Sequence, residues 1–510
     1  MKVILKQILP IFFLVGAFSS CKKELLDINI DPNNPTTASA SPSLVLANAL
    51  NTTAGIYNKA TAGNNNFVFA GLWLGHISYS GNYAIATENI SYALTNNFAS
   101  GVFANIYDNI EDYDFVEKKG TEQENSFYRA VGILMKAYNY QTLVDLYNNV
   151  PYTEALKGTG ASTPVYDNGK AIYDDLAKRI DTAISLLKTS ASASSITGDI
   201  MFKGDAVQWL EFANTVKLRL LLRQSQVADR QSYVQAEATK LAGSSFLTAD
   251  AAVNPGYLNS AGKMNPFWGQ NVNTSGTYTQ DLYRAGQFAI NFYQSNTDPR
   301  LSSFYKPTAA GTFVGNNFGD QGIPNSRTSE IGPGVLKSYS QSAVLMLAAE
   351  SYFLQAEAVA RGWIAGDAKD LYESGVKASF VYLGSNYPPL RNDANTADSI
   401  VYTPETSAER YYSQSGNKQT TWDATTSLQE KIALIIRQKW AAETFINELE
   451  PYNDYRRLHL PANIPLSVSP FSTGIFPNRL LYPQREYDVN SVNVLAQGNI
   501  TPGTKVWWMQ

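Results

Sequence analysis

Apolar residues recur at helical spacing in several long stretches of the chain. From Gly204 to Gln224, Trp209 and Phe212 begin a stripe that continues at offsets of three and four residues. Helices are predicted in the same way at Ser43 to Tyr57, Phe127 to Tyr147, Ile172 to Leu187 and Leu428 to Leu449. Asp167 stands where it could cap the helix that includes Ile172. These patterns predict a mainly α-helical protein.

Large and small residues alternate between two of the predicted helices, in the segment from Ser342 to Ser379. The alternating residues are Tyr352, Ala356, Ala368, Tyr372 and Gly375. This is the pattern of a tetratricopeptide-type helix pair, in which small residues allow two helices to approach closely while the aromatic rings fill the space. Paired helices are also predicted between Phe127 and Leu187, so we expect a stack of helical hairpins that carries long loops.

Two irregular segments, Asn64 to Asn97 and Asn254 to Leu336, combine aromatic residues with Gly, Ser and Asn. Long loops in compact proteins are usually functional or mobile. Aromatic rings there could stack on a sugar ring while nearby amides bind its hydroxyls. The candidate ligand-binding residues are Trp73, Tyr79, Asn82, Tyr83, Trp268 and Tyr278. The alternative is that Phe67, Phe69 and Trp73 close a buried helix end, and for Tyr79, Asn82 and Tyr83 both interpretations stay open.

The amino-terminal segment has the order of a secretory signal. Lys2 and Lys6 precede an apolar run, Ile8 to Phe18, which is too short to span a bilayer. Ser19 and Ser20 then precede Cys21, the only cysteine in the chain, as in a bacterial lipoprotein processing site. We expect a signal peptide over residues 1–20, a lipidated tether over 21–42 with Cys21 acylated, and a single domain over 43–510.

Composition narrows the possible partners. Without residues 1–20 the chain would carry 38 basic and 44 acidic residues, a net charge of −6. This mild acidic excess argues against nucleic acid, which needs clustered Lys and Arg. With Cys21 as the anchor, no disulfide can form, so stability must come from burial in a large core.

Catalytic motifs are not found in the sequence. Its two histidines, His76 and His459, lie far apart, so a His-rich metal centre is not expected, and neither is a cofactor. Carboxylates and arginines cluster between Glu443 and Arg457, which suggests a structural charge network more than acid–base catalysis. A glycoside hydrolase needs only two carboxylates and stays open as an alternative.

Several motifs, in order along the chain, resemble the SusD/RagB family, in its SusD-like branch. They are CKKELLDINIDPNNPT at Cys21, DLYNNVPYTEAL, WLEFANTVKLRLLLRQS, DPRL, AAESYFLQAEAVARGW with YESGVKAS, KIALIIRQKWAAETFINELEPYNDYRRL, FPNRLLYPQREYDVN and KVWW. The resemblance covers Cys21 to Gln510.

The resemblance implies an α-helical body with about four tetratricopeptide-like pairs, and irregular loops that form the ligand face. It implies a non-enzymatic lipoprotein of the cell outer membrane that faces the exterior and binds an oligosaccharide or similar nutrient oligomer. Its expected partner is a SusC-like TonB-dependent transporter. A surface glycoside hydrolase and a peptide-binding helical-repeat scaffold are the alternatives.

Overall fold

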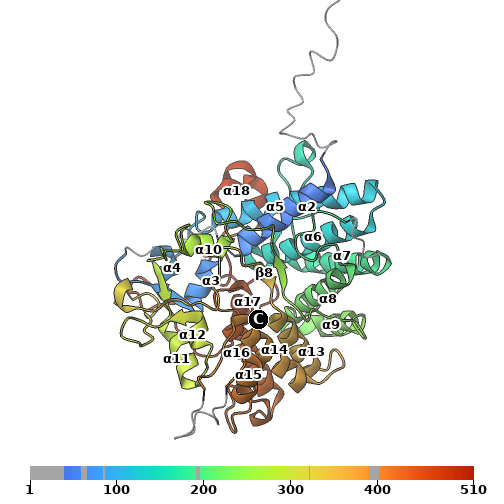
Figure 1. Ribbon diagram of the computed structural model, residues 1–510. Coiled ribbons are helices and arrows are strands. Elements are labelled where there is room, and N and C mark those ends of the chain that lie inside the picture. The colour runs from blue at the N-terminus through green and yellow to red at the C-terminus, as the bar shows by residue number, and fades with distance from the viewer. Residues whose placement is uncertain are drawn as a thin grey trace, which may run out of the picture.

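The computed structural model describes residues 40–58, 66–83, 87–190, 196–320, 322–389 and 401–509. Cys21, the expected signal peptide and nearly all of the expected tether lie outside these ranges. Figure 1 shows α2, α5, α6, α7 and α8 following one another down one side of the molecule, with α13, α14 and α15 below them. The longer helices are α2 (Pro42–Tyr57), α5 (Ser100–Glu122), α6 (Ser126–Tyr147), α7 (Gly169–Thr189), α8 (Ala206–Leu222), α9 (Gln231–Thr239), α11 (Gln287–Ser295), α13 (Ala348–Ala360), α14 (Ala368–Leu383), α15 (Pro404–Tyr412), α16 (Leu428–Ala442) and α17 (Leu449–Leu458).

Neighbouring helices form the row of hairpins that the sequence predicts. α5 packs between α2 and α6, α7 packs between α6 and α8, and α13 packs against α8, α14 and α16. A Cβ at Gly375 of α14 would lie 2.7 Å from the Phe353 ring of α13, and a Cβ at Gly132 of α6 would lie 2.6 Å from the backbone nitrogen of Glu117. Small residues therefore set the distance between paired helices, and the mainly α fold with tetratricopeptide-like hairpins is confirmed.

Long loops, short helices and small two-stranded sheets make up much of the other side of the molecule (Figure 1). The short helices are α3 (Val68–Trp73), α4 (Thr87–Ser91), α10 (Pro266–Asn271), α12 (Leu301–Phe304), α18 (Gln484–Val489) and α19 (Ser491–Leu495). The antiparallel strand pairs are β1 (Ile77–Tyr79) with β5 (Tyr283–Ala285), β2 (Val150–Pro151) with β3 (Tyr166–Asp167), β4 (Ala251–Val253) with β8 (Ala343–Met346), and β6 (Tyr305–Lys306) with β7 (Glu330–Ile331).

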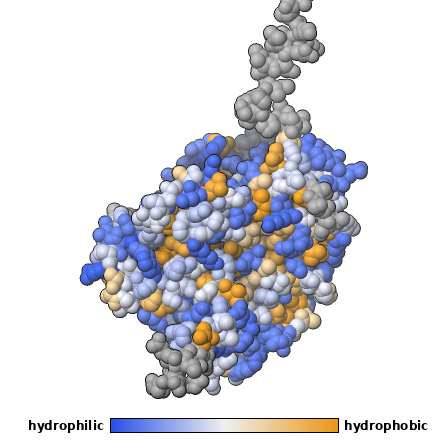
Figure 2. Space-filling view, viewed as in Figure 1, coloured by the Kyte–Doolittle hydropathy of each residue, from blue (hydrophilic) through white to orange (hydrophobic). Residues whose placement is uncertain are grey.

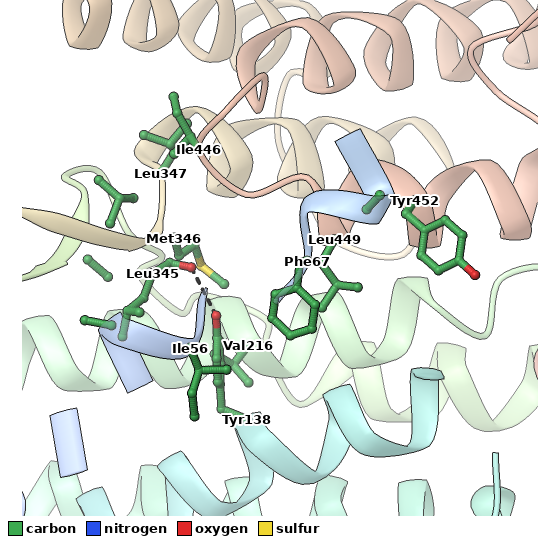
Figure 3. Close-up of a cluster of buried hydrophobic side chains, with 14 of the residues drawn as sticks. Ile56, Phe67, Tyr138, Val216, Leu345, Met346, Leu347, Ile446, Leu449 and Tyr452 are labelled. Carbon is green, nitrogen blue, oxygen red and sulfur yellow. Dashed lines mark hydrogen bonds between the residues drawn. The ribbon is translucent and has the colours of Figure 1, made fainter. Parts of the chain in front are cut away.

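A continuous apolar core joins the helical row to the loop-rich side. Figure 3 shows side chains from α2, α6, α8, β8 and α17 meeting in one cluster. Within it, the Tyr138 hydroxyl donates a hydrogen bond to the Leu345 carbonyl oxygen at 3.1 Å. Seen from the same side as in Figure 1, the surface is mostly hydrophilic, with hydrophobic residues dispersed among the polar ones (Figure 2).

Two local expectations need correction. Asn168, not Asp167, caps α7, because its side chain accepts hydrogen bonds from the backbone nitrogens of Lys170 and Ala171. Asp167 instead accepts from the backbone nitrogens of Tyr152 and Thr153, since β2 and β3 pair there. The predicted stretch from Leu428 to Leu449 is also interrupted: α16 ends at Ala442, and α17 begins only at Leu449.

Candidate functional site

Two of the candidate ligand-binding residues lie inside the core. Trp73 is completely buried at the end of α3, and its indole nitrogen donates to the Asn89 carbonyl oxygen at 3.1 Å. Tyr79 of β1 is also buried, and its hydroxyl accepts a hydrogen bond from the Asn89 side chain. A ligand at the surface cannot reach either ring, so both are corrected from ligand contacts to core residues.

Asn82 and Tyr83 lie at the surface, in the loop that follows β1. Tyr83 is 41% exposed, and its hydroxyl lies 3.4 Å from a carboxylate oxygen of Asp281. The Asn82 side-chain oxygen accepts a hydrogen bond from the backbone nitrogen of Asn325 at 2.7 Å, which ties this loop to a distant segment. β1 and β5 run antiparallel, so the residues after β1 meet those before β5.

Tyr278 approaches the same place from the segment before β5. The Arg284 guanidinium lies 5.5 Å from the centre of the Tyr278 ring, and it also lies 3.2 Å from Asp281. Burial raises the pKa of Tyr278 to about 12, although Arg284 opposes that shift. The surface made by Asn82, Tyr83, Tyr278, Asp281 and Arg284 is called the Tyr83 face below.

The Arg284 side chain is buried while that of Asp281 is about half exposed. Arg284 donates to the backbone oxygens of Gln280 and Tyr283, so its guanidinium is held from several sides. A held cation of this kind keeps the Asp281 carboxylate in place beside Tyr83. An exposed ring can stack on a sugar. A carboxylate beside the ring can accept hydrogen bonds from the hydroxyl groups of that sugar.

Trp268 lies shortly before the turn that carries Tyr278 and does not belong to the Tyr83 face. It lies on α10, where the Asn265 side chain caps the helix by accepting from the Trp268 backbone nitrogen at 3.0 Å. Val272, just after α10, pairs with Tyr278. Within the described ranges, no ring contact joins Trp268 to Tyr83 or Tyr278.

Sequence reasoning did not find Asp281 and Arg284. Asp281 is separated from Tyr83 by 198 positions, and only the pairing of β1 with β5 brings the two together. The clearest sequence signal of a binding site is the concentration of aromatic residues in both loop segments. It indicates Tyr83 and Tyr278 but not Asp281 and Arg284, which pair with each other beside them.

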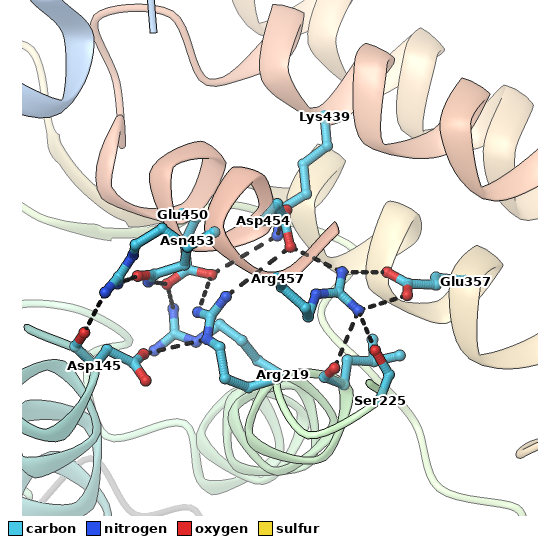
Figure 4. Close-up of polar contacts among 12 residues, drawn as sticks. Asp145, Arg219, Ser225, Glu357, Lys439, Glu450, Asn453, Asp454 and Arg457 are labelled. Carbon is cyan, nitrogen blue, oxygen red and sulfur yellow. Dashed lines mark hydrogen bonds and ion pairs between the residues drawn. The ribbon is translucent and has the colours of Figure 1, made fainter. Parts of the chain in front are cut away.

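The clustered acids and bases near α17 form a buried network, as Figure 4 shows. Arg223 lies 2.7 Å from Glu450, and Arg457 lies 2.6 Å from Glu357. Burial alone would raise the pKa of Glu357. The guanidinium groups of Arg457 and Arg361 instead lower this pKa to about 2. The network joins α8, α13, α16 and α17, which agrees with the structural role expected for these charges.

Not every acid in this region has a strong partner. Burial raises the pKa of Glu443 well above its usual range, and the neighbouring Glu350 adds to that shift. Neither carboxyl group has a hydrogen-bond partner among the described residues. Both side chains are fully buried, so a surface-bound glycan could not contact them.

The described part of the chain offers neither a membrane span nor an obvious metal site. None of its helices combines the length and the apolar character that crossing a membrane requires. Within the same ranges, no group of three or more His, Cys, Asp or Glu residues is placed to hold a metal ion.

Known proteins are similar to this chain in both sequence and fold. Residues 32–483 match the family model SusD-like_2, described as starch-binding associating with outer membrane. The chain matches none of the curated proteins.

Three solved structures illustrate the shared fold. A SusD-like protein from Bacteroides thetaiotaomicron has a TM-score of 0.71 at 24% identity, with 91% of this chain and 98% of that chain covered. A SusD homolog from Bacteroides fragilis has a TM-score of 0.70 at 21% identity, covering 92% and 99%. A chitin-binding SusD homolog from Flavobacterium johnsoniae has a TM-score of 0.70 at 23% identity, covering 91% and 98%. Because the family model spans most of the sequence, the protein belongs to the outer-membrane-associated SusD/RagB family, in its SusD-like branch.

Proposed function

We propose that this protein binds a glycan at the Tyr83 face without changing it chemically and passes it to a SusC-like TonB-dependent transporter. The observation that carries the proposal is the exposed Tyr83 ring beside the Asp281 carboxylate, which Arg284 holds in place. The family description and the chitin-binding relative support a glycan as the ligand class. Lipid attachment through Cys21 and exposure on the outer surface belong to the same proposal.

The expected affinity is modest and concentrated in few residues. A flexible sugar loses conformational freedom when it is bound, and this offsets part of the contact energy. Binding energy usually resides in a few aromatic or charged side chains. Tyr83 and Asp281 are therefore the residues whose loss should matter most, while Trp268 and Tyr278 are proposed to extend the contact.

The binding test uses isothermal titration calorimetry with maltohexaose and chitohexaose. Tyr83→Ala and Asp281→Asn are each expected to weaken binding about tenfold or more, which corresponds to roughly 1.4 kcal/mol. Phe471→Ala is the matched control, because Phe471 is a 72% exposed ring outside the Tyr83 face. Unchanged isotherms for both site variants would discard this face as the ligand site.

A separate experiment tests whether the protein leaves the bound glycan chemically unchanged. The wild-type protein is incubated with both hexasaccharides, and the products are separated over time. We expect the sugars to stay intact. Shortened products that disappear when one carboxylate is replaced would establish the glycoside hydrolase alternative instead. Tight binding of peptides in place of sugars would favour the helical-repeat scaffold.

A further inference from the structure

A groove of about 950 Å³ lies between α2, α5 and the segment of residues 255–270. No residue of the Tyr83 face lines it, although α10 contributes Pro266, Gly269 and Gln270 to one wall. The groove is therefore a different surface from the site described above.

The groove walls carry many hydrogen-bonding groups and little net charge. Asn51 of α2, Asn105 of α5 and Gln270 of α10 are exposed amides, each with both donors and acceptors. Among the described lining residues, a single carboxylate, Asp108, is balanced by a single ammonium group, Lys263. Such a lining suits a neutral ligand with many hydroxyl groups. An anionic polymer would find only one cation, and an apolar molecule would leave the amides unpaired.

Tyr257 adds an unsatisfied polar group to the same wall. Its side chain is more than nine-tenths buried, and its hydroxyl has no hydrogen-bond partner among the described residues. Burial raises the pKa of this hydroxyl, so it stays protonated and able to donate. An unmade hydrogen bond in a buried position is unfavourable, but this oxygen is closed off from the groove, so a ligand would meet the exposed groups of the wall and not this hydroxyl.

Glycines leave the backbone of the loop open to the groove. Gly256 and Gly262 have φ angles of +88° and +73°, a left-handed backbone conformation that glycine adopts most easily. At both positions, no neighbouring atom lies within 4 Å of the place where a Cβ would stand. The peptide groups there can therefore approach a ligand closely. Leu258, 57% exposed on the same loop, offers an apolar surface beside them.

We infer that this groove is a second ligand site, which holds a neutral saccharide segment. Exposed amides, one carboxylate and open peptide groups match the hydroxyls of a sugar, while the exposed Leu258 side chain matches its C–H face. The inference rests on the proposed glycan binding for its ligand class but adds a binding surface beyond the Tyr83 face.

The test fills the groove without straining the backbone. Gly269 does not have a positive φ, and a Cβ there would meet only Met264 at 3.5 Å, an ordinary contact. Gly269→Tyr should therefore fold normally and occupy the groove. The double variant Asn105→Ala/Asp108→Ala removes one amide and one carboxylate from the exposed face of α5. Glu111→Gln, on an exposed position of α5 outside the groove lining, is the matched control.

Two measurements are made with maltohexaose and chitohexaose: titration calorimetry, and hydrogen exchange of peptides that cover residues 101–112 and 254–271. In the wild type we expect bound sugar to slow exchange in both peptides. Gly269→Tyr and the double variant should abolish that protection and weaken binding about tenfold. Glu111→Gln should behave as the wild type.

The outcomes separate this inference from the proposed function. Sugar that binds without protecting residues 254–271, or protection that persists in Gly269→Tyr, would refute the groove site alone. Loss of binding only in Tyr83→Ala and Asp281→Asn would leave glycan binding at the Tyr83 face and also refute the groove. If neither hexasaccharide binds the wild-type protein, both proposals fail. Protection of the groove by peptides and not by sugars would overturn the ligand class.

Discussion

Identical residue types have opposite roles in this protein, depending on what packs around them. Tyr79 and Tyr83 are four positions apart, yet the first is buried against Tyr283 and Asn89, and the second is exposed beside Asp281. Tyrosine suits both environments because it joins a flat apolar ring to a hydroxyl. The sequence pattern therefore left both interpretations open for these residues, and Trp73 also proved to belong to the core.

Glu443 allows a prediction about the dependence of stability on pH. Burial and the neighbouring Glu350 raise its pKa in the folded protein, and Lys439 only partly opposes this. In the unfolded chain the group ionises above about pH 4.3, while the folded protein keeps the proton. Its contribution to stability is therefore present at low pH and is lost as the pH rises toward the folded pKa.

We expect Glu443→Gln to raise the melting temperature relative to wild type at pH 8, and to have little effect at pH 4. Glu122→Gln, at an exposed position, should show no such difference. The measurement is thermal unfolding by circular dichroism across this range. A Gln variant that is less stable at pH 8 than at pH 4, relative to wild type, would show that Glu443 is ionised and paired in the fold.

The helices themselves were the most predictable part of the structure. The predicted helices Ser43 to Tyr57 and Phe127 to Tyr147 correspond to α2 and α6 within one residue at each end. Their apolar stripes depend on local spacing, which the sequence displays directly. The break between α16 and α17 was not predicted, because Phe445 takes a positive φ that its residue type does not signal.

Close packing of α5 and α6 leads to a second prediction. A methyl group at Gly132 would lie 2.6 Å from the Glu117 backbone nitrogen and 2.8 Å from the Tyr113 carbonyl oxygen, and backbone atoms cannot move aside easily. Gly132→Ala should therefore destabilise the protein by about 1–3 kcal/mol, despite the higher helix propensity of alanine. Urea denaturation measures the change.

Gly160→Ala is the control for this substitution, because a Cβ there would meet nothing closer than Lys157 at 3.8 Å. We expect its unfolding free energy to stay within about 0.5 kcal/mol of wild type. Equal losses for the two variants would mean that the close approach of α5 and α6 does not limit residue size at Gly132.

The proposed arrangement of the entire protein is a helical body held to the outer membrane by a lipidated tether. Nineteen residues lie between Cys21 and Ser41, which caps α2. We propose that a tether of this length lets the body rest on a membrane partner. Stable anchoring would need more than one acyl chain on Cys21.

Replacing the proposed anchor should separate location from binding. Cys21→Ser is expected to move most of the protein from the membrane fraction to the soluble fraction, while the purified protein keeps its affinity for maltohexaose or chitohexaose. Lys23→Ser, two positions away, should stay with the membrane. Fractionation with immunoblotting and mass spectrometry of the amino terminus measure this. A Cys21→Ser protein that remains in the membrane fraction would contradict the lipid anchor.

The sequence by itself determined the helical class, the paired helices and the family, because periodic spacing and ordered motifs are local properties of the chain. It also indicated the two loop segments that carry the exposed aromatic residues. Only the tertiary structure decided that Trp73 and Tyr79 are core residues, that Asp281 and Arg284 accompany Tyr83, and that α2, α5 and the 255–270 segment enclose a groove. The physical reason is that exposure and contact depend on segments far apart in the chain, and the three-residue pairing of β1 with β5 leaves no periodic signal from which to infer them.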